Sequence, residues 1–144
     1  MAALRNKFRI ARNGRSGAAL VELAIAMPIL LLLTLGLIEY GWVFLRVSQI
    51  NQAARQGVRV AVRPGVTEET INSNVTSMMN QAGLGSSGYV LTHTDIDVAV
   101  GQAVTVQINV NYGPLSLTGT SLVPLPTQLV GRATMAKEGD PTTP

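Results

Sequence analysis

Residues 23–38 read LAIAMPILLLLTLGLI, sixteen consecutive residues without a charge. When the stretch is extended to residues 18–44, its only charged residues are Glu22 and Glu39, near the two ends. A helix that crosses a membrane needs about 20 mostly apolar residues, each adding a rise of about 1.5 Å. This stretch therefore predicts a single transmembrane helix near the N-terminus.

Three residues add detail to this predicted helix. Tyr40 and Trp42 follow the apolar run, and amphipathic rings of this kind favour the membrane–water interface. Pro28 lies inside the run and removes one backbone hydrogen bond, so it predicts a kink or a locally melted turn. A functional hinge and an ordinary membrane-helix proline are both open interpretations of Pro28.

A basic leader precedes the apolar run and sets its predicted orientation. The leader contains no acid and five basic residues, which are Arg5, Lys7, Arg9, Arg12 and Arg15. The positive-inside rule therefore predicts a cytoplasmic N-terminus and a C-terminal domain outside, although four more widely spaced arginines follow the run. A cleaved secretory signal peptide is the competing interpretation. It fits less well because the apolar run is too long and residues 39–44 make a poor cleavage site.

The composition limits the functions that the chain can have. The 144 residues carry a net charge of +3, but residues 16–144 hold six basic and eight acidic residues, so the basic character belongs to the leader. No basic surface interleaved with aromatic residues indicates nucleic-acid binding. There is no cysteine, and no zinc spacing, phosphate loop or catalytic nucleophile pattern occurs. We therefore expect no enzymatic activity, no cofactor, no metal and no nucleic-acid partner.

The junction between leader and helix carries the first specific pattern. Residues 15–22 read RSGAALVE, in which Glu22 is the fifth residue after Gly17. This resembles the processing site of type IV pilin-like proteins, which a prepilin peptidase cuts after the glycine. The resemblance implies a scissile bond between Gly17 and Ala18, and a pairing of Glu22 with the free amine of an adjacent subunit. Considered on physics alone, Glu22 is also compatible with an interfacial glutamate that reaches the lipid headgroups.

A second pattern narrows the resemblance to one family. Residues 39–42 read EYGW and residues 51–61 read NQAARQGVRVA. An apolar helix that ends in this way and continues into such a segment resembles the TadE-like family. These are minor pilins, or pseudopilins, of the tight-adherence type IV pilus system. The resemblance implies a bacterial inner-membrane protein whose partners are the prepilin peptidase, other pilin and pilus-assembly subunits and the lipid bilayer.

Residues 46–62 continue the helix beyond the membrane with a narrow apolar stripe. Arg55 and Arg59 share one face, which is either solvated or a contact surface for partner subunits or acidic lipid headgroups. Gly57 weakens a helix intrinsically, so close packing against a neighbour is a reason for its presence. The candidates for helix packing or partner contact are Pro28, Glu39, Tyr40, Arg55, Gly57 and Arg59.

The remaining sequence predicts a small α+β domain. Thr67 is placed to cap a short second helix that ends at Gly83. Alternating residues then predict strands at 95–100 and 104–112, joined by a tight hairpin at Gly101-Gln102, and a last strand at 128–136. About three antiparallel strands would pack on the helices in a pilin-like arrangement.

These predictions divide the chain into four parts. They are a leader at 1–17, a transmembrane and membrane-proximal helix at 18–63, an extracytoplasmic domain at 64–138 and a disordered tail at 139–144. Two functions stay open. The first is a processed minor pilin, either incorporated in the filament or acting at its base. The second is an unprocessed single-pass scaffold of a pilus or secretion machine.

Overall fold

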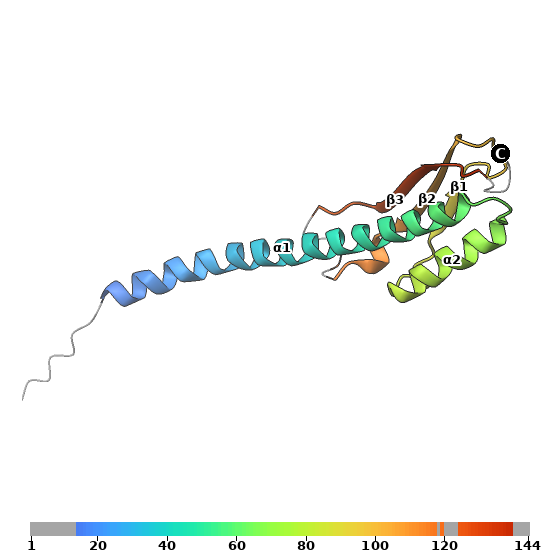
Figure 1. Ribbon diagram of the computed structural model, residues 1–144. Helices are drawn as coiled ribbons and strands as arrows, with labels where there is room; N and C mark the ends of the chain where they lie inside the picture. The colour runs from blue at the N-terminus through green and yellow to red at the C-terminus, as the bar shows by residue number, and fades with distance from the viewer. Residues whose placement is uncertain (1–13, 118, 120–123, 140–144) are drawn as a thin grey trace, which may run out of the picture. The chain divides into compact units, whose positions relative to one another are not determined.

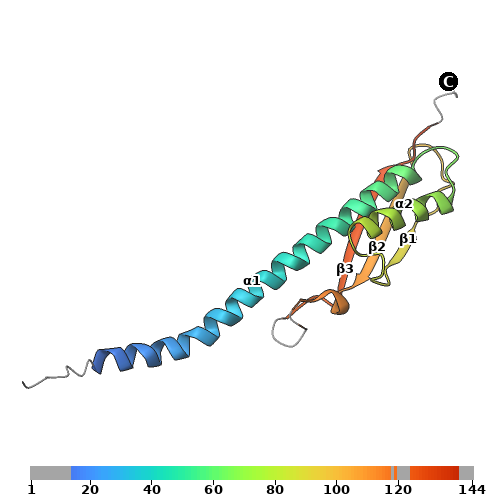
Figure 2. The ribbon, with the colours of Figure 1, turned by 90° about the horizontal axis from the view of Figure 1, so that it is seen from below.

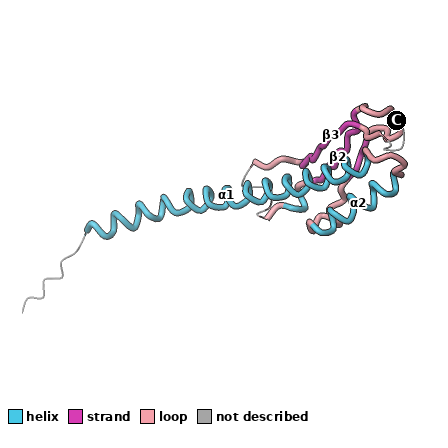
Figure 3. The backbone as a smooth tube through the Cα atoms, viewed as in Figure 1, coloured by secondary structure: helices cyan, strands magenta, loops and turns pink. Residues whose placement is uncertain are grey.

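The computed structural model describes residues 14–117, 119 and 124–139. Most of the predicted leader (1–13) and of the predicted tail (140–144) therefore lies outside the described residues. In chain order the elements are α1 (Gly14–Ala61), α2 (Glu68–Gln81), β1 (Val90–His93), β2 (Ala103–Asn111), the 3-10 helix η1 (Gly113–Leu115) and β3 (Gln128–Ala136) (Figure 1). The α+β prediction is confirmed: one long apolar helix precedes a short helix and three antiparallel strands (Figure 3).

The chain forms two compact units, and the boundary between them falls inside α1. We call Met1–Leu35 the N-terminal unit and Gly36–Pro144 the C-terminal unit. The second part of α1, from Ile50 onward, supplies core residues to the C-terminal unit.

Within the N-terminal unit, α1 exposes large apolar side chains on all sides, including Leu23, Ile29 and Leu33. The helix is unbroken through Pro28, so of the two predicted outcomes the locally melted turn does not occur and the kink stays a prediction. A proline in a helix removes a single backbone donor, and the helical bonds on either side are enough to keep the turn together.

The three strands form one sheet in the order β1-β2-β3, with both pairs antiparallel. On its inner face, Ile108 of β2 stands opposite Leu91 of β1 and Gly131 of β3. Every second residue of β2 is buried, so its period of two separates an apolar face from a polar one. The buried β2 residues and the one that follows them are Val104, Val106, Ile108, Val110 and Tyr112.

Both helices cover the inner face of the sheet within the C-terminal unit, as Figure 2 shows from below. Two glycines permit the close approach. A Cβ at Gly57 of α1 would lie 2.7 Å from Val75 of α2, and one at Gly131 of β3 would lie 2.8 Å from the backbone of Ile50. These distances are shorter than real Cβ contacts, so α1 meets α2 and β3 where no side chain intervenes.

Helix α2 begins and ends as the sequence predicts. The Thr67 side chain accepts a hydrogen bond from the Thr70 backbone N–H, which makes it the N-cap. Ile71, Val75 and Met79 are its buried residues, spaced by one helical turn. Gly83 then adopts a positive φ of 68° just beyond the helix, a conformation that glycine reaches without steric cost.

The predicted strand at 95–100 and the tight hairpin after it are wrong. The first strand is β1, at Val90–His93, and residues 94–102 form the connection to β2. The Asp95 carboxylate accepts a hydrogen bond from the Asp97 backbone N–H at 2.9 Å, a local turn that competes with strand pairing. Ile96 and Val98 alternate because they pack against the edge of the core from this loop.

Two cations from other elements bind the C-terminal ends of the helices. The Lys137 ammonium donates to the carbonyls of Ala61 and Arg63 at the end of α1, at 3.3 and 3.2 Å. The Arg46 guanidinium donates to the Ala82 carbonyl at the end of α2, at 2.8 Å. Positive charge at a helix C-terminus satisfies free carbonyls and opposes the helix dipole, so these contacts hold the elements of the C-terminal unit together.

Candidate functional site

Gly17 and Ala18, the pair predicted to flank a scissile bond, lie in the first turns of α1, which begins at Gly14. Both residues are exposed, and no side chain or distant backbone atom comes within 4 Å of the position of a Gly17 Cβ. The first four backbone N–H groups of a helix have no acceptor inside the helix. Among the described residues, unwinding the chain at this bond therefore breaks only the first helical hydrogen bonds and no side-chain contact at Gly17.

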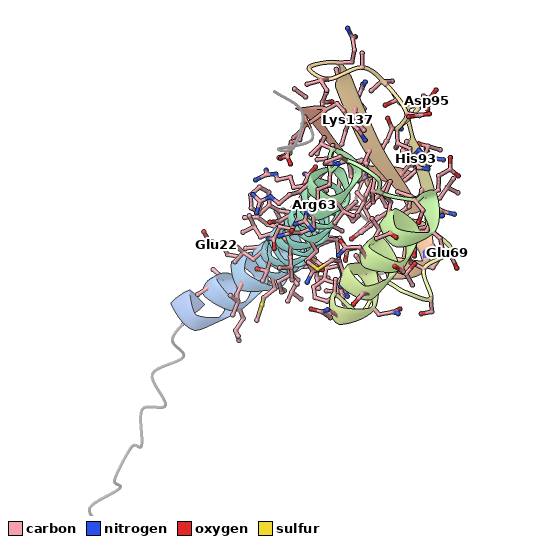
Figure 4. The ribbon with its side chains drawn as sticks, turned by 45° about the vertical axis from the view of Figure 1, so that its right-hand side comes forward. Glu22, Arg63, Glu69, His93, Asp95 and Lys137 are labelled. Carbon is pink, nitrogen blue, oxygen red and sulfur yellow. The ribbon has the colours of Figure 1, made fainter. Side chains whose placement is uncertain are left out.

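Glu22 lies four residues after Ala18 and is exposed among apolar neighbours such as Val21 and Leu23. Figure 4 shows its side chain pointing outward from the helix. Within the part of the chain that the structure describes, its carboxylate has no hydrogen-bond or ion-pair partner. Residues four apart share one helical face, so the Glu22 carboxylate and the backbone amine that a cut after Gly17 would create lie on the same side of α1.

Glu39, the second acid of the apolar run, has the opposite environment. It is fully buried and accepts a hydrogen bond of 2.5 Å from the Tyr112 hydroxyl. The backbone N–H of Leu117 donates to both of its carboxylate oxygens, each at 3.2 Å. The sequence makes Glu39 a candidate for helix packing or partner contact, and the structure binds it inside the chain. Its carboxylate ties α1 to the end of β2 and to the loop that follows.

The contact between Tyr112 and Glu39 changes the acidity of the phenol. Burial raises the pKa of Tyr112 well above its ordinary value of 10.0, and the hydrogen bond and negative charge of Glu39 raise it further. The positive charge of Arg46 acts in the opposite direction but is the smallest influence. Tyr112 therefore stays protonated and remains a hydrogen-bond donor to Glu39.

Two neighbouring aromatic residues bind the same loop. The Tyr40 hydroxyl donates to the Pro124 carbonyl and the Trp42 indole N–H donates to the Leu115 carbonyl, each at 2.8 Å. Together with the bonds of Glu39, these contacts fasten the segments on both sides of residues 118–123 to a single stretch of α1. We call this set of contacts the α1–loop junction.

The remaining candidates fall on two different sides of α1. Arg55 and Arg59 are exposed, and both line a shallow groove of about 150 Å³ beside Met78. Gly57 is buried against Val75, so the structure explains it through packing inside the chain. The described residues do not bring the two arginines into contact with Glu22 or with the α1–loop junction.

The sequence contained only part of the information needed to find the α1–loop junction. Glu39 stood out as an acid at the end of an apolar run, and Tyr112 as the last apolar position of an alternating strand. Nothing in either pattern indicates that the two meet, because they are 73 residues apart. No group of three or more His, Cys, Asp or Glu side chains that could hold a metal ion occurs among the described residues.

The fold and the site define a class of protein. One helix is long and apolar enough to cross a membrane, and the C-terminal unit packs a small antiparallel sheet on the later turns of that helix and on α2. The family model described as TadE-like protein matches residues 17–59, which confirms the resemblance noted in the sequence and associates the chain with the tight-adherence pilus system. No curated protein and no solved structure matches the chain.

Proposed function

We propose that this chain is a minor pilin, or pseudopilin, that takes part in the assembly of a tight-adherence type IV pilus and has no enzymatic activity. The observation that carries the proposal is the exposed carboxylate of Glu22 among apolar side chains, one helical turn after the accessible Gly17–Ala18 bond. The TadE-like match begins at Gly17 and includes both features.

In this proposal the function depends on assembly chemistry. A prepilin peptidase cuts after Gly17 and releases the basic leader, which leaves a positive α-amino group on Ala18. Glu22 of one subunit then pairs with the amine of its neighbour. An ion pair is much stronger in an apolar environment than in water, so apolar helix surfaces such as Leu23 and Ile29 favour this pairing when subunits come together.

The proposal also includes a location. The chain crosses the bacterial cytoplasmic membrane once, with the leader in the cytoplasm and the C-terminal unit outside. The five basic residues of the leader and the hydropathy of α1 support this orientation. Its partners are the prepilin peptidase and the other pilin and pilus-assembly subunits.

The N-terminus of the mature protein tests the processing step. Mass spectrometry of the protein purified from piliated cells is expected to find Ala18 as the first residue. Replacing Gly17 by leucine should block the cut, whereas Gly14→Leu should not, because Gly14 has no glutamate five residues after it. An intact leader in cells with an active prepilin peptidase would refute processing and favour the unprocessed scaffold.

The assembly role of Glu22 is tested by piliation. Glu22→Ala is expected to abolish or strongly reduce pili while the protein still inserts in the membrane and is still cut. Glu68→Ala, which removes an exposed carboxylate from the first turn of α2, is the matched control and should leave piliation unchanged. Normal pili in the Glu22→Ala strain would remove this residue from the mechanism.

A further inference from the structure

We propose that the C-terminal unit carries a second membrane contact, formed by Tyr40, Phe44, Leu117 and Pro124, which rests in the headgroup region of the outer leaflet. We call these four residues the interfacial surface. The inference rests on the proposed function only in requiring that α1 spans the membrane. It adds a lipid-binding surface outside the spanning helix.

The length of the apolar run places this surface at the membrane boundary. Residues 18–38 have one charge, Glu22, and at about 1.5 Å per residue they extend about 31 Å. The hydrocarbon core of a bilayer is about 30 Å thick. When the run fills this core, Tyr40 lies at the outer boundary and Phe44, one turn further and on the same face, lies among the headgroups.

The α1–loop junction brings the loop to the same height. Leu117 is bound through its backbone N–H to Glu39, and Pro124 through its carbonyl to Tyr40. Figure 1 shows the described loop segments beside α1, next to the turns that follow the apolar run. Leu117 and Pro124, bound to residues 39 and 40, therefore lie beside them.

The exposed apolar side chains of the C-terminal unit are concentrated in this region. Phe44 is 77% exposed, Leu117 is 56% exposed and Tyr40 is 49% exposed. In addition, the sequence has no charged residue between Asp97 and Arg132. Several exposed apolar side chains close together, beside a segment without charge, are what a surface in the headgroup region is expected to have.

Three described backbone groups of the loop are bound by α1 side chains, which suits them to this environment. The N–H of Leu117 and the carbonyls of Leu115 and Pro124 are each bound by a residue of α1. Pro124 and Pro126 have no N–H to satisfy. Unsatisfied backbone groups are what exclude irregular loops from the membrane, so these bonds lower the cost of placing this loop against lipid.

Depth-dependent fluorescence quenching in nanodiscs tests the inference. The full chain is reconstituted at one copy per disc, in phosphatidylethanolamine and phosphatidylglycerol with nitroxide-bearing lipids. Because the chain has no cysteine, single fluorophores can be attached at Leu117→Cys, at Leu31→Cys inside the apolar run and at Val130→Cys on the outer face of the sheet. All three side chains are exposed, so labelling does not disturb the core.

The expected result is that nitroxides near the headgroups quench the label at Leu117→Cys several-fold more than the label at Val130→Cys. Nitroxides deep in the acyl chains should quench the label at Leu31→Cys most strongly. If Leu31→Cys is quenched but Leu117→Cys behaves like Val130→Cys, the interfacial surface is refuted and the spanning helix stands. If Leu31→Cys is not quenched, the spanning helix is refuted as well.

A second copy of the chain is the alternative occupant of this surface. In that case the label at Leu117→Cys would be accessible to iodide in single-copy discs and protected only when several copies share a vesicle, which would overturn the inference. The result does not depend on leader cleavage or piliation. An intact leader in cells with an active prepilin peptidase would refute processing, and quenching at Leu117→Cys in the discs would still leave the lipid contact in place.

Discussion

The two parts of α1 have similar residues and opposite environments. Up to Leu35, in the N-terminal unit, the helix leaves Ile29 and its large apolar neighbours exposed, whereas in the C-terminal unit Ile50 is fully buried against the sheet. The same contrast holds for the acids, because Glu22 is exposed and Glu39 is buried. Residue type therefore does not decide the role of a position along this helix.

This difference separates the part of α1 that stabilises the fold from the part whose surface can contact other molecules. The part that contains Glu39 and Ile50 has its side chains satisfied by α2, by the sheet and by the loop after β2. The part that contains Glu22 and Ile29 has no such partners among the described residues, so its surface is free for lipid or for other subunits. Substitutions in the part that contains Glu39 and Ile50 should change the stability of the C-terminal unit. Substitutions in the part that contains Glu22 and Ile29 should change membrane behaviour or assembly.

The largest effect is expected from a matched pair of isoleucines. Ile50→Ala removes a fully buried side chain and should lower the free energy of unfolding of the C-terminal unit by about 4 kcal/mol. Ile29→Ala removes a side chain that is 65% exposed and should change it by less than about 0.5 kcal/mol. Both changes in the free energy of unfolding can be measured by urea denaturation of the full chain in detergent micelles. The fluorescence of Trp42, the only tryptophan, reports the unfolding.

The two glutamates provide the next test. Glu39→Ala leaves the Tyr112 hydroxyl and the Leu117 N–H without their acceptor, which should cost about 3 kcal/mol. Glu22→Ala should leave the stability of the C-terminal unit within about 0.5 kcal/mol of the wild type. Equal losses in the same urea titration would show that the contrast between the two acids is wrong.

Two glycines test the close contact between α1 and the sheet. Gly131→Ala places a Cβ 2.8 Å from the backbone of Ile50, which cannot rotate away, and should destabilise by about 2 kcal/mol. Gly41→Ala meets no such atom within 4 Å and should instead stabilise α1 by up to about 1 kcal/mol. Thermal unfolding by circular dichroism distinguishes the two signs, and a stabilising Gly131→Ala would contradict the close approach.

The last expected effect concerns pH. Because the pKa of Tyr112 is raised in the folded state, the unfolded chain releases this proton first as the pH rises above 10. Stability should therefore be constant in this respect below pH 10 and fall by about 1.4 kcal/mol per pH unit above it. Tyr112→Phe should remove that part of the slope in urea titrations between pH 9 and 11.5, and an unchanged slope would exclude Tyr112 as its source.

The sequence predicted those parts of the fold that depend on neighbouring residues. The apolar run, the Thr67 cap, the glycine after α2 and the strands β2 and β3 follow from composition, capping chemistry and a period of two. The prediction failed where a local turn produced the same period as a strand, at Asp95 and the residues after it. A side chain that accepts a hydrogen bond from the backbone N–H two residues later, as Asp95 does, is not distinguishable from a strand residue by its polarity alone.

By itself, the sequence determined that this chain has a long apolar stretch with an acid near each end, preceded by a segment rich in positive charge. It also determined the glycine and glutamate spacing on which the resemblance to the TadE-like family partly rests. Only the tertiary structure decided that Glu39 is buried while Glu22 is exposed, because the groups that bind Glu39 are 73 and 78 residues away along the chain. The sequence of one helix shows the spacing of its apolar and charged residues. Whether a given residue is buried depends on which distant segment of the chain packs against it.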